Sequence, residues 1–211
     1  MAASHSRAGL RCPEAPSRQT KMQQLALFGT SADPPTIGHQ LLLEGLLELF
    51  PQVVTWASDN PIKSHGAPLE LRSQMLAALV AEIANPRLQH VQQLSSPWAI
   101  ETLRRAAARW PHTELVFVVG SDLVGQIHRW KQADALLAGC RLAIAPRQGW
   151  PLAPGELPAL ERLGARLELL PLTVPATASS ALRDRPDRHQ IPAGVWSLLL
   201  LHNLYGLSEV P

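Results

Sequence analysis

The stretch QLALFGTSADPPTIGH, residues 24–39, decides the fold of this chain. It starts with an apolar run typical of a buried strand and ends where an amphipathic stretch begins. Small residues and prolines lie between the two. Small residues let a backbone approach a ligand closely, and the free amides at a helix start favour an anion. The stretch therefore predicts a phosphate-binding loop, although a plain strand–turn–helix connection with a solvated His39 shows the same pattern.

Apolar runs and amphipathic stretches continue to alternate along the rest of the chain. We expect strands at Gln24–Gly29, Val53–Ser58, Leu88–Gln93, Glu114–Gly120, Arg141–Ala145 and Arg166–Leu170. We expect helices at Ile37–Phe50, Pro68–Ile83, Ala99–Arg109, Ser121–Leu137, Leu157–Leu163, Ser179–Arg183 and Pro192–Leu201. This order predicts a single α/β domain whose mostly parallel sheet carries helices on both faces. Such sheets bind ligands at the carboxyl ends of their strands.

Composition narrows the class of protein. The chain has 211 residues, of which 46% are hydrophobic and 17% charged, with a formal net charge of +2. This composition excludes wholesale disorder and disfavours a nucleic-acid partner, which needs a basic stripe. Two distant cysteines and the lack of a long apolar segment predict a cytoplasmic protein without a membrane span. We expect residues 1–21 to be a disordered tail and residues 22–211 to form the domain.

Two short motifs near opposite ends of the domain resemble the signatures of one enzyme family. Residues 36–39, TIGH, resemble the (H/T)xGH signature of the nucleotidyltransferase superfamily. Residues 29–39 are similar to GGTFDPxHxGH, the opening of bacterial nicotinate-nucleotide adenylyltransferases, and residues 177–183, TASSALR, are similar to their second signature, ISSTxxR. The resemblance implies a Rossmann-like nucleotidyltransferase fold. It also implies transfer of the adenylyl group of ATP to nicotinate mononucleotide, giving deamido-NAD and pyrophosphate.

The resemblance implies that ATP binds at both signatures and at two strand ends between them. The ATP-binding residues would be Gly29, Thr30, Ser31, Thr36, Gly38, His39, Gly120, Asp122, Arg147, Ser179, Ser180 and Arg183. Hydroxyls and amides can hold phosphate oxygens, and a guanidinium can clamp two of them. For an isolated Ser-Ser-x-x-Arg, however, a plain helix cap with a solvated arginine is the better interpretation.

The catalytic residues implied by the resemblance are His39, Lys63 and Arg183. The 5′-phosphate of the acceptor is already an anion, so the reaction needs alignment and charge neutralisation and no general base. We expect His39, Lys63, Arg183 and Mg²⁺ to be the positive partners. Mg²⁺ should arrive on ATP because no carboxylate cluster forms a dedicated metal site. Lys63 and His65 could equally be plain exposed loop residues.

The resemblance places the acceptor at Ser31, Ala32, Lys63, Ala99, Ile100 and Trp130. Trp130 follows Asp122 by the same eight-residue step as in similar enzymes, where the indole stacks on the pyridine ring. Core packing is the alternative for any tryptophan, and we expect it for Trp56, Trp110 and Trp196. Ala99 replaces a threonine that helps to bind the nicotinate carboxylate in some relatives. A backbone amide of Ala99 or Ile100 would have to accept that carboxylate, and we expect the acid to be preferred over the amide.

Other functions remain open at this stage. Nicotinamide mononucleotide could be the acceptor, and phosphopantetheine adenylyltransferases and cytidylyltransferases share the TxGH motif. The spacing from Asp122 to Trp130 argues against these last two. A non-catalytic nucleotide-binding regulator would explain Thr30 and Ala32, which replace the family's glycine and phenylalanine. Intact His39 argues against such a regulator. The sequence does not predict the oligomeric state.

Overall fold

The computed structural model describes residues 23–61, 63–175 and 179–207. Its six strands form one sheet in the order β3-β2-β1-β4-β5-β6, and every neighbouring pair is parallel. The strands are β1 Gln24–Thr30, β2 Gln52–Ala57, β3 Leu88–His90, β4 Glu114–Gly120, β5 Arg141–Ala145 and β6 Arg166–Leu169. The order reverses between β1 and β4, and parallel sheets bind ligands beyond the carboxyl ends of the strands at such a point.

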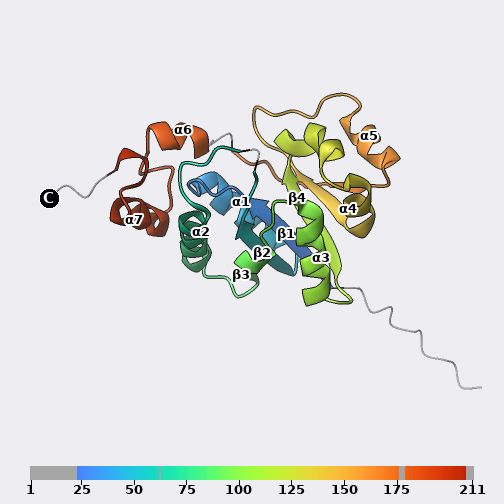
Figure 1. The fold of residues 1–211 in the computed structure, drawn as a ribbon, viewed down its shortest axis with the longest axis horizontal. Coiled ribbons are helices and arrows are strands. Elements are labelled where there is room, and N and C mark those ends of the chain that lie inside the picture. Colours follow the sequence, from blue (N-terminus) through green and yellow to red (C-terminus); the bar gives the residue numbers. More distant parts are fainter. Residues whose placement is uncertain (1–22, 62, 176–178, 208–211) are drawn as a thin grey trace, which may run out of the picture.

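Helices cover both faces of the sheet, as Figure 1 shows. Helices α1 Ile37–Leu49, α2 Leu69–Ile83, α6 Ser179–Asp184 and α7 Ala193–Leu201 lie on one side, and α3 Ala99–Arg109, α4 Ala133–Gly139 and α5 Glu156–Arg162 lie on the other. Three short 3₁₀ helices, η1 Gln92–Leu94, η2 Ser121–Arg129 and η3 Leu204–Gly206, complete the described elements. The predicted fold class is therefore confirmed.

The two hydrophobic cores follow directly from strand geometry. Side chains alternate between the faces of a strand, so Ala26 and Phe28 of β1 join the core under α1 and α2. Leu25 and Leu27 of the same strand join the core under α3 and α4. Each of these four residues is at most 7% exposed. The full burial of both faces explains why the strands are continuously apolar.

The tryptophans expected in the cores are there. Trp56 is 3% exposed and meets Phe117 edge to face at a centroid distance of 6.3 Å. Trp110 and Trp196 are partly buried against the two cores. Core packing of these three side chains is thus confirmed.

Two elements differ from the sequence expectation. The helix expected over Ser121–Leu137 is divided into η2 and α4, because Gln132 adopts a left-handed conformation with φ of 53° between them. The strand expected to reach Gln93 ends at His90, and η1 follows it. The predicted tail lies outside the described residues and stays a prediction. In the described part of the chain, no helix is long and apolar enough to cross a membrane.

Candidate functional site

His39 connects the predicted phosphate-binding loop to the first helix. Thr36 is the N-cap of α1, and its backbone N–H donates to His39 Nδ1 at 3.1 Å. The Thr36 hydroxyl lies 2.9 Å from the same nitrogen. An Nδ1 that accepts an N–H carries no proton, so the proton of the neutral ring is on Nε2, which donates to Thr30 Oγ1 at 2.9 Å. The predicted group of Thr30, Thr36 and His39 is therefore in direct contact, with an N–H donor at the sheet edge.

The environment of His39 keeps its imidazole neutral. Burial, followed by the positive charges of Arg147 and Lys63, lowers the His39 pKa to about 4. Burial and the neighbouring charges disfavour the positive charge expected on His39, and that role stays a prediction. The neutral ring contributes an N–H donor, and the charges come from its neighbours. The shift also shows that Arg147, after β5, and Lys63, after β2, both act on His39 at this edge.

The remaining loop residues shape the backbone around His39. Gly29 lies in β1 against the indole of Trp56, and the backbone carbonyl of Ser31 accepts a hydrogen bond from Arg72. Ala32 is fully buried in a left-handed conformation with φ of 51°. Gly38 is buried in the first turn of α1.

The end of β4 is coupled to the loop after β5. Arg147 Nη1 lies 3.3 Å from Asp122 Oδ2, and the Arg147 backbone N–H donates to Ser121 Oγ at 3.0 Å. A Cβ on Gly120 would lie 2.3 Å from Asp122 Oδ1, so a side chain at position 120 would force this carboxylate to move. The structure therefore joins the predicted residues Gly120, Asp122 and Arg147 in one polar cluster next to His39.

The second signature contacts the first. Ser179 Oγ donates to the Pro34 carbonyl at 2.9 Å, and Arg183 Nη1 lies 3.3 Å from the Asp33 carbonyl. Ser180 is exposed at the start of α6. Residues 177 and 178 of this signature lie outside the described residues. Residues nearly 150 positions apart in the chain thus meet at one edge of the sheet.

The loop after β2 divides its two basic residues between different environments. Lys63 is exposed, and its charge reaches His39. His65 Nδ1 lies 3.5 Å from Asp33 Oδ2, and the side chain of His65 is 16% exposed. Lys63 therefore fits the predicted anion contact, whereas His65 faces the buried carboxylate.

Of the residues predicted for the acceptor, Ala99 and Ile100 lie at the start of α3, and Trp130 lies at the end of η2. Gln92 Nε2 and Ser95 Oγ donate to the Ala57 carbonyl at 2.9 and 2.8 Å, which places this helix start at the carboxyl end of β2. Ala99 and Ile100 form the first turn of α3, whose N-cap has no side-chain hydrogen bond. Trp130 ends η2 and is partly buried against the second core. Its stacking role stays a prediction.

The sequence reasoning assigned no role to Trp98, the N-cap of α3, or to Lys131, which follows Trp130. The Trp98 side chain is 41% exposed, and Lys131 Nζ lies 4.8 Å from the centroid of its ring. Arg104 of α3 donates to Gln132 Oε1 at 2.8 Å, which fixes the segment after Trp130 along the helix. The available sequence signals were a tryptophan directly before the predicted helix Ala99–Arg109 and a lysine directly after Trp130.

Buried polar residues were also missed. Arg72 is 2% exposed and donates to the carbonyls of Ser31, Ser58 and Ala67 at 2.7, 2.9 and 3.1 Å. Its guanidinium therefore ties the loop after β1 to the loop after β2. The signal was an arginine on the otherwise apolar face of a helix.

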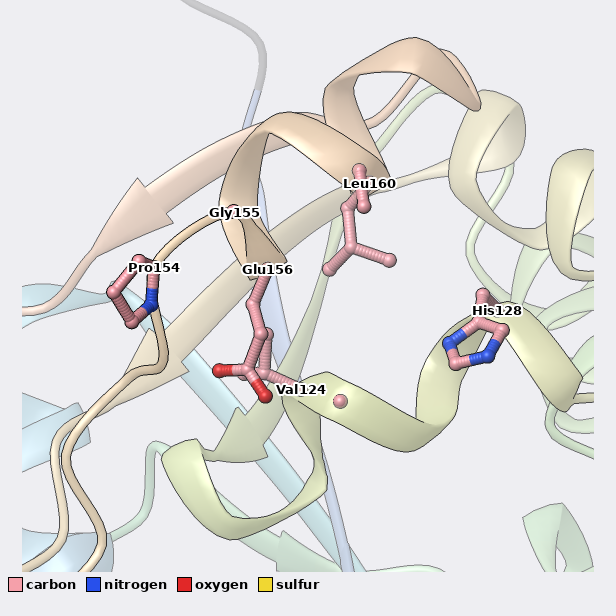
Figure 2. Close-up of a pocket in the computed structure, with 8 residues that line it drawn as sticks. Val124, His128, Pro154, Gly155, Glu156 and Leu160 are labelled. Carbon is pink, nitrogen blue, oxygen red and sulfur yellow. The ribbon is translucent and has the colours of Figure 1, made fainter.

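A cavity of about 300 Å³ lies elsewhere, between η2 and α5. Val124, Leu160 and Glu156 contribute to its wall, and Figure 2 shows Glu156 and His128 with Leu160 between them in this view. None of the cations predicted to bind phosphate lines this cavity. The polar edge around His39 therefore remains the better candidate for a triphosphate.

A parallel sheet whose predicted phosphate-binding loop lies near Arg147 and Lys63 and is contacted by α6 is typical of a nucleotide-binding α/β protein. The cytidylyltransferase-like family model matches residues 27–184, and the chain belongs to this family.

Comparisons with individual proteins point to one branch of that family. A probable nicotinate-nucleotide adenylyltransferase from Synechocystis is 36% identical over 197 residues, covering 86% of this chain and 98% of the relative. One from Thermus thermophilus is 30% identical over 196 residues, covering 86% and 99%. The Plasmodium falciparum nicotinic acid mononucleotide adenylyltransferase complexed with NaAD shares the fold, with a TM-score of 0.70 and 16% identity over 88% of this chain and 98% of that chain.

Proposed function

We propose that this protein transfers the adenylyl group of ATP to nicotinate mononucleotide, forming deamido-NAD and releasing pyrophosphate. The observation that carries the proposal is that His39, held to Thr30 at the end of β1, is within electrostatic reach of Arg147, after β5, and Lys63, after β2. Arg183 approaches the same loop from α6. The names of the relatives support the proposed chemistry, and the grouping of these residues supports this edge of the sheet as its place.

The proposed mechanism relies on binding and alignment. The 5′-phosphate of the acceptor attacks the α-phosphorus of ATP, the bond from this phosphorus to the β-phosphate oxygen breaks, and pyrophosphate leaves. His39 donates its Nε2–H to a phosphate oxygen in place of Thr30, while Lys63 and Arg183 neutralise the charge that builds on the leaving group. A neutral donor suits His39, because its ring would otherwise have to be protonated between Arg147 and Lys63.

Mg²⁺ is proposed to enter as part of the nucleotide substrate. In the described ranges, no three His, Cys, Asp or Glu residues are grouped so that they could hold a metal ion. Asp33 accepts hydrogen bonds from the protein, and Asp122 pairs with Arg147. Both carboxylates near the loop are therefore engaged. An ion carried on the phosphates would add charge neutralisation without a dedicated protein site.

The acceptor is proposed to be the acid because Lys131 provides a positive charge beside the pyridine position. Its ammonium lies over the exposed face of Trp98, next to Trp130 and to the first turn of α3. A carboxylate attached to a ring stacked on Trp130 could meet both this ammonium and the first amides of the helix. The uncharged amide of nicotinamide would lose this attraction.

The deciding experiment compares kcat/KM for nicotinate mononucleotide and nicotinamide mononucleotide with ATP. We expect the acid to be used at least about tenfold better, and CTP to replace ATP poorly. In K131M this ratio should fall by about tenfold, while R129M, which removes a neighbouring surface charge, should leave it within about twofold. Equal or better use of the amide by the wild-type protein contradicts the acid preference. No turnover of either acceptor contradicts the proposed function itself.

A further inference from the structure

Asp33 is a fully buried carboxylate that joins four segments of the chain. The backbone N–H groups of Gly66 and Ala67 donate to its two oxygens at 2.8 and 3.1 Å. The hydroxyl of Tyr205, in η3, donates at 2.5 Å. Arg183 Nη1 approaches at 3.4 Å from α6. The phosphate-binding loop, the loop that carries Lys63, the second signature and the C-terminal turn therefore depend on one side chain.

These contacts differ in strength. The Tyr205 and Gly66 hydrogen bonds are short, whereas the Arg183 contact is at the limit of a hydrogen bond. The Arg183 side chain is 29% exposed, and a guanidinium has five N–H donors. Asp33 is thus satisfied mainly by the amides and the tyrosine. Arg183 is left with donors that an anion can use.

Tyr205 reaches Asp33 through an unusual backbone. Its φ is 54°, in the left-handed region, which is uncommon for a residue with a side chain and persists only where the surroundings hold it. Tyr205 is the only tyrosine of the chain. A Cβ on Gly66 would lie 2.8 Å from Tyr205 Cε1 and 2.6 Å from Arg183 Cδ, so the tyrosine ring and Arg183 are packed over the same glycine.

From this geometry we propose that Tyr205 is a positioning residue for triphosphate binding. Its hydroxyl fills one acceptor site of Asp33, so the carboxylate does not draw Arg183 inward and the guanidinium is free to bind phosphate. Tyr205 donates to Oδ1, and without its hydroxyl this oxygen keeps, among the described residues, only the Ala67 amide. Arg183 Nη1, at 3.4 Å from the neighbouring Oδ2, and His65 Nδ1, at 3.5 Å from it, are the side-chain donors that could then shift toward Oδ1. Arg183 would then have to be withdrawn from Asp33 each time ATP binds. The inference rests on the proposed function only in assigning ATP to Arg183.

The test is a double-mutant cycle of Y205F and R183Q. Phenylalanine removes the hydroxyl and keeps the ring. In the wild-type background, Y205F should raise KM for ATP about five- to tenfold and leave KM for nicotinate mononucleotide within about twofold. In the R183Q background, Y205F should change KM for ATP less than about twofold, because its effect passes through Arg183.

A matched control separates positioning from simple loosening of the turn. Leu207 packs against the first core next to η3 and makes no described contact with Asp33, so L207A weakens the turn without removing the hydroxyl. L207A should leave KM for ATP within about twofold. Independent effects of Y205F and R183Q, an equal KM change in L207A, or a Y205F protein that does not fold would each overturn the inference.

Calorimetry distinguishes this inference from the proposed function. The dissociation constant of MgATP is measured for the same four proteins of the cycle, without an acceptor. Coupling between Y205F and R183Q in this constant would support the positioning role even if no adenylyl transfer were found. Additive changes in the constant would overturn it even if the enzyme turned over as proposed.

Discussion

Variants of His39 can separate an effect on stability from an effect on activity, because its two ring nitrogens make different hydrogen bonds. Nδ1 accepts the backbone N–H of Thr36, which is a fully buried residue, and Nε2 donates outward to Thr30 Oγ1. Asparagine can place an oxygen near the Nδ1 position but no donor at Nε2. Glutamine can place an amide N–H near Nε2 but no acceptor at Nδ1. H39A therefore removes both the donor and the acceptor. H39N removes only the donor, and H39Q removes only the acceptor.

The magnitudes follow from these contacts. Loss of a donor that stabilises charge during phosphoryl transfer should cost about 10²-fold or more in kcat. H39A and H39N should both show this loss, and H39Q should recover part of it. Leaving the buried Thr36 N–H without an acceptor should lower the free energy of unfolding by about 1–3 kcal/mol. H39A and H39Q should lose this amount, and H39N should retain most of it.

The assays are pyrophosphate release at saturating ATP and nicotinate mononucleotide, and urea denaturation of the same proteins. The reasoning predicts that the ranking of the variants by activity differs from their ranking by stability. An H39A rate within about threefold of wild type would refute the catalytic role. Identical rankings in the two assays would refute the division of labour between the nitrogens.

Three further predictions concern the surroundings of His39. The His39 ring should titrate near pH 4 by NMR. R147Q should raise this pKa more than K63Q does, because the charge of Arg147 has the larger effect of the two. An unchanged titration midpoint in both variants would contradict this prediction. Since the unfolded ring binds its proton near its ordinary pKa of 6.5, H39N should lose less stability than wild type as the pH falls from 6.5 to 4, measured by urea denaturation. R72M should lower the free energy of unfolding by about 3 kcal/mol or more, because three carbonyls lose their donor, and a loss below about 1 kcal/mol would contradict that role.

The sequence predicted the parallel sheet because each strand is buried on both faces and therefore reads as a continuous apolar run. The split between η2 and α4 was not predictable in this way. Gln132 has no sequence feature that demands a left-handed conformation, and its side chain accepts a hydrogen bond from Arg104 of another helix. The hydrophobic periodicity of a segment does not predict a contact with another helix.

The sequence predicted those residues of the candidate site that belong to its two signature motifs. Thr36, His39, Ser179 and Arg183 belong to signatures that can be recognised along the chain, and the structure brings them to one edge of the sheet. Tyr205 belongs to neither signature. It reaches the site only because the last turn folds back over Gly66, which is a property of the tertiary structure.

The most direct measurement is a crystal structure of the protein with a non-hydrolysable ATP analogue and Mg²⁺. The account predicts phosphate oxygens within hydrogen-bond distance of His39 Nε2, with Thr30 Oγ1 released, and a phosphate paired with the Arg183 guanidinium. A triphosphate bound elsewhere, for example in the cavity between η2 and α5 shown in Figure 2, with the His39–Thr30 contact intact, would contradict it.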